Sequence, residues 1–378
     1  MKPIIGVTPD FNAGDRKEWG GREPTYFLRA RYIRAIEELG GIQTREAEMS
    51  FSFADRGLDL HYAVHRGWGA LFHQRRNLVS PRFYRLFSDL LRFRREPWQE
   101  LMEGLITPEE TLTGYLGRRG YSQPFIQSFV LPIGRAIWSV PLGALLEFPA
   151  ATFLRFLGNH GYLGGGPRSH WRTIVGSSQQ YVDRFSSLFT GTTRLNERVR
   201  AVERHESSVE VITAGGERLS FDHVILATHA DQSLRLISQP TALEKRLLGA
   251  WHYKRTTAVL HTDTALMPTH RRLWASWNVA YDSLASPGAP QSAVTYHLNR
   301  VQGLASEKDY FVTLDGETSA AQVLKRLDYE HPVFDRSGIA AQSELARLNR
   351  EGRLRFCGSY FGYGFHEDAM RSASEIDI

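Results

Sequence analysis

The segment from Gly362 to Ala369 combines residue types that could hold an anionic or electron-rich ligand. Gly362 and Gly364 allow a backbone to approach a ligand closely. Glu367 and Asp368 are typical of the first turn of a helix, which we expect to run on through Ala369. A helix N-terminus presents N–H groups without intrahelical acceptors and a partial positive charge. Two interpretations stay open: a ligand-binding turn, and a glycine-rich strand-to-helix turn without a ligand.

A second pattern is a cationic stripe on an expected helix. Ser80 and Pro81 are a suitable N-cap and first-turn pair. The polar stripe after them is Arg82, Arg85, Asp89 and Arg92, and the apolar stripe is Phe83, Leu86, Phe87, Leu90 and Leu91. Such a helix could lie on an anionic membrane. We prefer the ordinary alternative, a surface helix whose apolar side packs on the core.

Cysteine and histidine chemistry is sparse in this chain. Cys357 is the single cysteine, so it cannot form an internal disulfide, and no Cys/His cluster has metal-ligand spacing. We therefore expect no metal site and a reducing, cytoplasmic setting. No catalytic base can be named. Structural roles are preferred for the remaining polar candidates, which are Tyr363, His366, and Tyr296 and Asn299 on one expected strand.

Apolar periodicity predicts the elements that would position these residues. Residues 2–8 and 222–228 are apolar runs typical of buried parallel strands, and a helix is expected over residues 24–41. A hairpin is expected at residues 209–221, with Gly215 and Gly216 as its two-residue turn. Further strands are expected at residues 257–261, 293–298, 310–314 and 354–357. The alternation of strands and helices indicates a mixed α/β protein.

Composition sets the limits of the functional interpretation. The chain has 378 residues, 42% apolar and 23% charged, with a net charge of +5 and a pI near 9.3. This is typical of a globular protein with two or three domains. An anionic partner is conceivable, but no zinc-finger, RNP or helix-turn-helix pattern favours nucleic acid. The most apolar stretch, residues 136–157, is interrupted by charged residues and prolines, so we expect no spanning helix.

Several blocks, in order, together resemble one family. They are Met49-Ser50-Phe51-Ser52-Phe53, Gln74-Arg75-Arg76-Asn77-Leu78, Ala136-Ile137-Trp138-Ser139, Asn159-His160-Gly161, Trp274-Ala275-Ser276-Trp277-Asn278, Thr295-Tyr296-His297-Leu298-Asn299, Phe356-Cys357-Gly358-Ser359-Tyr360 and Gly362-Tyr363-Gly364-Phe365-His366-Glu367-Asp368. From about Gln43 onward the chain resembles the FAD-dependent, amine-oxidase-like oxidoreductases. The likeness implies a Rossmann-type, glutathione-reductase-like FAD/NAD(P)-binding domain, here incomplete, with an inserted α+β substrate domain.

The resemblance also implies an order of segments along the chain. Residues 43–170 would form a mainly helical cap, and residues 235–352 the sheet of the substrate domain. Residues 171–234 and 353–378 would be the second and last parts of the FAD-binding domain. Residues 1–42 would replace its usual start.

By the same resemblance, FAD is the expected cofactor and a small amine or lipid-like molecule the substrate. Val199 would lie beside the adenine, and Ala227 and Thr228 would end a strand that faces the cofactor. Gly358 and Ser359 would run under the diphosphate and ribityl chain. The turn of Gly364, Phe365, Glu367, Asp368 and Ala369 would direct a helix N-terminus at the flavin ring. Related oxidases hold a water near the flavin with a lysine, and the resemblance makes Lys254 a candidate for this role.

The start of the chain departs from this family. A G-x-G-x-x-G turn between a strand and a helix is expected there, because a diphosphate must approach backbone N–H groups, but residues 1–42 contain no such pattern. Residues 1–42 instead resemble the start of γ-glutamyl-GABA hydrolases of the class I glutamine-amidotransferase type, through Lys2-Pro3-Ile4-Ile5-Gly6-Val7-Thr8-Pro9-Asp10 and Ala35-Ile36-Glu37-Glu38-Leu39-Gly40-Gly41. We therefore expect a fusion. Two alternatives to a flavoenzyme stay open for this chain: an inactive remnant without cofactor, and a lipid-surface binding module.

Overall fold

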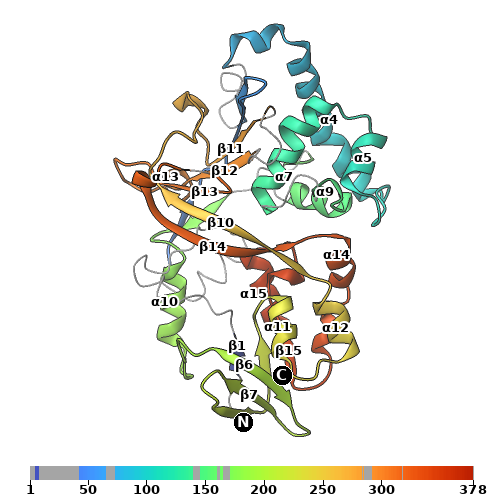
Figure 1. Cartoon of the computed structure of the whole chain (residues 1–378). Coiled ribbons are helices and arrows are strands. Elements are labelled where there is room, and N and C mark those ends of the chain that lie inside the picture. The colour runs from blue at the N-terminus through green and yellow to red at the C-terminus, as the bar shows by residue number, and fades with distance from the viewer. Residues whose placement is uncertain are drawn as a thin grey trace. The chain divides into compact units, whose positions relative to one another are not determined.

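The computed structural model describes the backbone of residues 5–7 and residues 42–64, 73–138, 145–159, 162–164, 171–282, 284, 292–316 and 318–377. The chain forms two compact units, each made of separated stretches of sequence (Figure 1). The first unit contains Met1–Arg45, Arg172–Tyr253 and Pro332–Ile378, and the second contains Glu46–Trp171 and Lys254–His331. The expected helix at residues 24–41, the G-x-G-x-x-G position and most of the amidotransferase-like segment lie outside the described residues.

The first unit is built around a three-stranded parallel sheet. The strands are β1 (Ile5–Val7), β9 (Val224–Leu226) and β15 (Leu354–Phe356), in the order β1-β9-β15. Val7, Leu226 and Phe356 are in register, so all three strands end at the same edge. The strand predicted at residues 222–228 is confirmed as buried and parallel. Paired residues 219 positions apart in β1 and β9, and 130 positions apart in β9 and β15, therefore meet through main-chain pairing.

An antiparallel sheet and a set of short helices complete the first unit. The sheet is β6 (Val199–Arg204), β7 (Val209–Thr213) and β8 (Arg218–Phe221), and a small ladder joins β2 (Thr44–Glu46) to β5 (Arg172–Ile174). The helices are α10 (Gln179–Leu188), α11 (Ala230–Leu236), α12 (Ala242–Leu248), α14 (Arg336–Gln342), η5 (Leu345–Asn349), η6 (Ser359–Phe361) and α15 (His366–Ser374). The predicted hairpin is confirmed, but its loop has four residues rather than two. Gly216 (φ +87°) donates to the carbonyl of Thr213 within it.

The second unit contains a seven-stranded sheet in the order β14-β10-β13-β12-β11-β3-β4. The strands are β3 (Phe51–Asp55), β4 (Leu60–Ala63), β10 (His252–His261), β11 (Trp277–Tyr281), β12 (Ser292–His297), β13 (Phe311–Leu314) and β14 (Val323–Val333). β3 pairs with β11 in parallel, although Phe51 and its partner Trp277 are 226 positions apart in the chain. The other pairs of known register are antiparallel. The strands predicted at residues 293–298 and 310–314 are confirmed within one residue, and the one predicted at 257–261 is confirmed but begins five residues earlier, at His252. Asn299, expected on a strand, instead lies in the short helix α13 (Leu298–Val301).

Helices gather beside this sheet (Figure 1). They are η1 (Arg75–Val79), α4 (Pro81–Met102), α5 (Leu112–Arg118), α6 (Gln123–Phe125), the π-turn η2 (Ile126–Val130), α7 (Leu131–Trp138) and α9 (Ala150–Asn159). The Tyr62 hydroxyl donates to the carbonyl of Ser128, and the rings of Phe51 and Phe129 pack edge to face at 6.4 Å. These contacts attach the helical layer to β3 and β4.

The helix predicted after Ser80 is confirmed as α4. The Ser80 hydroxyl accepts from the N–H of Phe83, and Pro81 occupies the first turn, where its missing N–H costs nothing. Two predicted positions are wrong. Asp89, placed on the polar stripe, is 4% exposed and accepts from the N–H of Ser122, whereas Leu91, placed on the apolar stripe, is 50% exposed.

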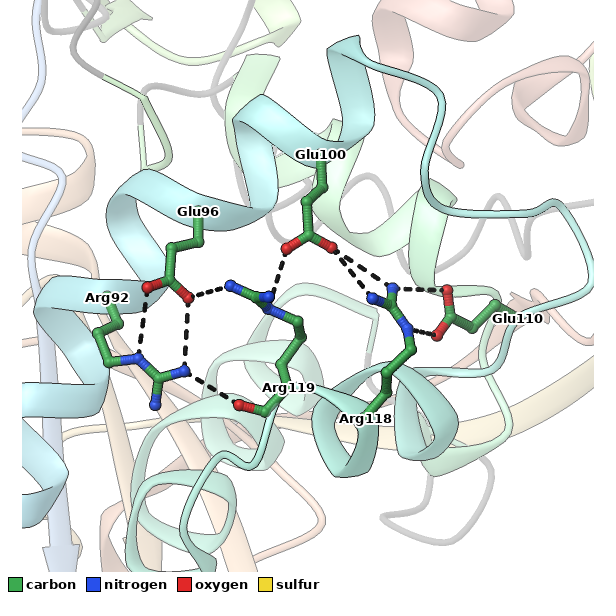
Figure 2. Close-up of polar contacts among 6 residues, drawn as sticks. All are labelled: Arg92, Glu96, Glu100, Glu110, Arg118 and Arg119. Atoms are coloured by element: carbon green, nitrogen blue, oxygen red, sulfur yellow. Dashed lines mark hydrogen bonds and ion pairs between the residues drawn. The ribbon is translucent and has the colours of Figure 1, made fainter.

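A chain of ion pairs ties α4 to α5 and the loop before it (Figure 2). Glu96 accepts from Arg119 at 2.6 Å and from Arg92 at 3.4 Å. Glu100, 8% exposed, lies between Arg119 at 2.9 Å and Arg118 at 3.4 Å, and Arg118 continues to Glu110 at 2.8 Å. Cations and anions alternate, so each buried or half-buried charge has a partner of opposite sign.

Candidate functional site

The carboxyl edge of the parallel sheet is where most of the expected cofactor-binding residues meet. Ala227 and Thr228 follow β9, and Gly358 and Ser359 follow β15 after Cys357. The N–H of Cys357 donates to the carbonyl of Leu226 at 3.2 Å, which extends the pairing of β9 and β15 to this edge. The strand ends of an open α/β sheet are the usual place for ligands. Because every group described here belongs to the first unit, the arrangement is set within one compact body.

Gly358 is required by its surroundings. Its backbone has φ +156°, and a Cβ placed there would lie 2.7 Å from a ring carbon of Tyr360 and 3.7 Å from the carbonyl oxygen of Thr228. The N–H of Gly358 donates to the hydroxyl of Ser372, which is 2% exposed. Ser372 lies on α15, so this bond fixes the helix against the end of β15. The strand-to-helix turn is thereby held at both ends.

Asp368 organises the turn that leads into α15. Its carboxylate is 4% exposed and accepts from the N–H of Tyr363 at 2.9 Å and of Phe365 at 3.2 Å. A Cβ at Gly362 would lie 2.0 Å from the Asp368 carboxylate, so only glycine fits beside it. Gly362 and Gly364 both donate to the carbonyl of Ser359, at 3.1 Å each. The backbone donors that a ligand could meet here therefore belong to the first turn of α15 itself.

The residues of the turn, which the sequence analysis assigned to the cofactor together, have different roles in the structure. Asp368 is a buried acceptor that shapes the turn, and it uses part of the positive charge at the helix N-terminus. Gly364 has φ +92°, and a Cβ there would lie 3.0 Å from the ring of Phe334. Phe365 precedes the helix, and Glu367 and Ala369 are half-buried in its first turn.

Val199 lies in another part of the first unit. It is the first residue of β6 and pairs with Thr213 across the antiparallel sheet. Beside it is an open hollow of about 720 Å³, lined by residues that include Arg194, Asn196 and Arg198. The link to the parallel sheet runs through Val202, which bridges Ile237 just after α11. Ala227, Thr228, Gly358, Ser359 and the α15 turn form one connected group, and Val199 is attached to it through these intermediate elements.

Two contacts near the turn had no clear signal in the sequence. The Tyr181 hydroxyl of α10 lies 3.5 Å from Nδ1 of His366, at the first position of α15. Gln342 of α14 donates to the carbonyls of Tyr360 and Gly362, at 2.9 and 2.6 Å. Neither Tyr181 nor Gln342 stands in a recognisable motif. They are close to the turn because the tertiary fold places α10 and α14 there.

The other candidates occupy structural positions. The Tyr296 hydroxyl donates to the carbonyl of Ala136, and Asn299 clamps a loop through the N–H of Tyr310 and the carbonyl of Lys308. The ammonium of Lys254 lies 3.4 Å from Asp315, which also accepts from Arg135 at 3.1 Å. Lys254 and Arg135 thus share one carboxylate in the second unit.

Among the described residues one His/carboxylate group has ligand atoms within 4.8 Å of one another: Glu203, His205 and Glu210. Arg218 pairs with both glutamates, at 3.2 Å to Glu203 and closer to Glu210. The guanidinium therefore takes the place that a cation would need. The chemistry of this hairpin surface is that of an ion-pair cluster.

Comparison with protein families gives one decisive match. A sequence model of flavin containing amine oxidoreductases matches residues 61–270, which is 210 of the 378 residues. The chain belongs to this family. Its members are flavoprotein oxidoreductases, as the resemblance of the sequence had implied, so that expectation is confirmed at the level of the family. Comparison with curated proteins gives no match.

Solved structures of similar fold agree with this family assignment. Cyclohexylamine oxidase from Brevibacterium oxydans IH-35A has a TM-score of 0.59 at 12% identity, covering 93% of this chain and 86% of that one. Wild-type putrescine oxidase bound to putrescine has a TM-score of 0.55 at 13% identity, covering 92% and 85%. A fatty acid isomerase from P. acnes has a TM-score of 0.58 at 10% identity, covering 92% and 84%. At such identities the likeness is one of fold.

Proposed function

We propose that this chain is an FAD-dependent, amine-oxidase-like oxidoreductase that removes a hydride from a small amine or lipid-like substrate. Membership of the flavin containing amine oxidoreductases supports the reaction class. The observation that carries the proposal to particular residues is the connected group at the carboxyl edge of β9 and β15. There the glycine turn and the N-terminus of α15 meet the strand ends.

The residues present at this edge fit a dinucleotide cofactor. Gly358 keeps the backbone free of a Cβ at the end of β15, and Ala227 adds a small side chain at the end of β9. We propose that Ala227, Thr228, Gly358 and Ser359 line the path of the cofactor chain, and that the turn from Gly364 to Ala369 borders the ring. Val199 would contact the adenine from β6. The G-x-G-x-x-G position falls outside the described residues.

A bound flavin supplies the hydride acceptor, which no amino-acid side chain can provide. The first turn of α15 contributes a fixed partial positive charge at the edge where negative charge would develop, and this favours reduction. Asp368 keeps that turn in place.

The visible absorption spectrum of the purified protein, recorded before and after addition of FAD, tests the proposal. We expect flavin absorbance that stays with the protein through gel filtration. Colourless protein that also ignores added FAD would falsify it and would favour the inactive-remnant alternative. Retention of flavin together with turnover of amines would support the full proposal.

Two glycine variants make the test specific to the site. Gly358→Leu fills the edge of β15 and is expected to abolish flavin retention. Gly352→Leu is the matched control, because Gly352 also has a positive φ, +81°, and receives the same side chain, but no atom lies within 4 Å of its Cβ position. Equal flavin content in both variants would place the cofactor elsewhere. A melting curve for each variant separates loss of binding from loss of fold.

A further inference from the structure

The surface along η1 and α4 carries an unusual density of exposed apolar side chains. They are Leu78 (50% exposed), Val79 (81%), Tyr84 (49%), Leu91 (50%), Met102 (61%) and, just beyond the helix, Leu105 (57%). We call this set the apolar stripe. Six large apolar side chains exposed within 28 consecutive residues exceed the scattered exposure that is normal for a surface.

The stripe is straight. Tyr84, Leu91 and Met102 are spaced by 7 and 11 residues, and at about 100° per residue they lie within about 20° of one line along α4. The line is about 27 Å long, from 18 residues at about 1.5 Å each. The Tyr84 hydroxyl donates to the carbonyl of Leu78 at 2.8 Å, which joins η1 to the start of the line.

The opposite face of α4 fixes this orientation. Phe83, Leu86 and Phe93 are at most 2% exposed. Trp98, seven residues after Leu91, lies on the line of the stripe instead, where it is half-buried and packs on Gly158 of α9. A rotation of the helix that buried the stripe would expose this core. The apolar stripe is therefore a stable feature of the folded unit.

Exposed arginines lie on η1 and α4, the same elements that carry the stripe. Arg75, Arg82, Arg85, Arg94 and Arg95 are exposed, and none of them makes an ion pair within the described part of the chain. Arg92, Arg118 and Arg119 form the contrast, since each is paired with glutamate in the network of Figure 2. Glu103 at the end of α4 accepts from Gln99. Within the described residues Arg92 is therefore neutralised by carboxylates of its own helix, whereas Arg85, Arg94 and Arg95 make no ion pair.

We propose that the apolar stripe and its unpaired arginines bind the surface of an anionic lipid bilayer. A helix of this kind lies in the interface, with apolar side chains between the headgroups and arginines on the phosphates. No helix in the described part of the chain is long and apolar enough to cross a bilayer. A second copy is a poorer occupant, because a twofold contact would set arginine against arginine. Arg92, expected at the sequence level to take part, is excluded by its bonds to Asp89 and Glu96.

Vesicle co-sedimentation of the full chain tests this assignment. We expect binding to phosphatidylcholine vesicles that contain phosphatidylglycerol, weak binding to phosphatidylcholine alone, and loss of binding at high salt. Each arginine near an anionic surface contributes about fivefold in affinity. The triple variant R85E/R94E/R95E is therefore expected to bind about a hundredfold more weakly, or less. The double variant L91Q/M102Q removes two apolar side chains of the stripe and is therefore also expected to weaken binding to the vesicles.

A charge-matched control removes the effect of net charge. R326E/R336E/R350E changes the charge equally at exposed arginines that also lack ion pairs within the described residues, and it should bind like wild type. Wild-type protein that ignores anionic vesicles, or equal binding of both triple variants, would overturn the proposal. A dimer in solution that dissociates when Leu91 and Met102 are both replaced by glutamine would also overturn the proposal. All variants alter exposed side chains, and unchanged melting curves confirm that they fold. The assay needs no flavin, so its outcome is independent of the proposed oxidoreductase activity.

Discussion

Replacement of Asp368 by alanine is expected to destabilise the first unit strongly. The carboxylate is 4% exposed and accepts from two backbone N–H groups, of Tyr363 at 2.9 Å and of Phe365 at 3.2 Å. Hydrogen bonds to a charged acceptor contribute about 1.5–3 kcal/mol each. Two of them give about 3–6 kcal/mol. Because Tyr363 and Phe365 are half-buried and water can reach part of the turn, we take the lower end, about 3 kcal/mol.

Thermal unfolding followed by circular dichroism measures this loss. For a unit of this size about 1 kcal/mol shifts the melting temperature by about 2–4 °C, so the expected decrease is about 6–12 °C. Glu367→Ala is the matched control. It removes the neighbouring carboxylate of the same helix turn. Because the Glu367 carboxylate accepts no hydrogen bond among the described residues, its loss should change the unfolding free energy by less than about 0.5 kcal/mol. If the two variants melt at the same temperature, the assignment of Asp368 as the organiser of the turn is wrong.

Three further predictions follow from single residues. Gly358→Ala places a Cβ 2.7 Å from the Tyr360 ring, so it should cost about 1–3 kcal/mol in chemical denaturation; an unchanged midpoint would show that the turn relaxes freely. Burial alone would raise the pKa of Glu96, but hydrogen bonds from Arg119 and Arg92 outweigh it and lower the pKa. The ionised Glu96 therefore stabilises the fold at pH values above its unfolded pKa, and this stabilisation is lost as the pH falls through its folded pKa. The difference in unfolding free energy between wild type and Glu96→Gln should shrink in acid. A difference that grows in acid would contradict the lowered pKa. Burial raises the pKa of Cys357 to about 11, so a thiol reagent at pH 8 should label it only on unfolding; rapid labelling of native protein would contradict its burial.

Two arginines at equivalent positions of α4 differ in their ion pairs within the described structure. Arg85 and Arg92 are seven residues apart, so in sequence they occupy the same line of the helix. Arg92 lies within reach of Asp89, Glu96 and the carbonyl of Arg119, whereas Arg85 has no such neighbours in the described structure. Two of these partners, Asp89 and Glu96, lie on α4 itself, three residues before and four residues after Arg92, and the third is the carbonyl of Arg119 beyond α5.

The sequence by itself determined the local elements and the family. The N-cap at Ser80, the strands around residues 224–226 and 354–356, and the helix after Phe365 all follow from apolar period, capping and glycine placement, which act over a few residues. Ordered motifs over most of the chain were enough to identify the flavin containing amine oxidoreductases.

Tertiary structure alone decided which side chains of a helix are buried. Asp89 became buried through the N–H of Ser122, and Leu91 stayed in solvent. Helical period gives the direction of a side chain relative to its own helix, but burial depends on the elements that pack around it. Such contacts join residues far apart in the chain, as Gly358 and Thr228 are, and no local pattern records them.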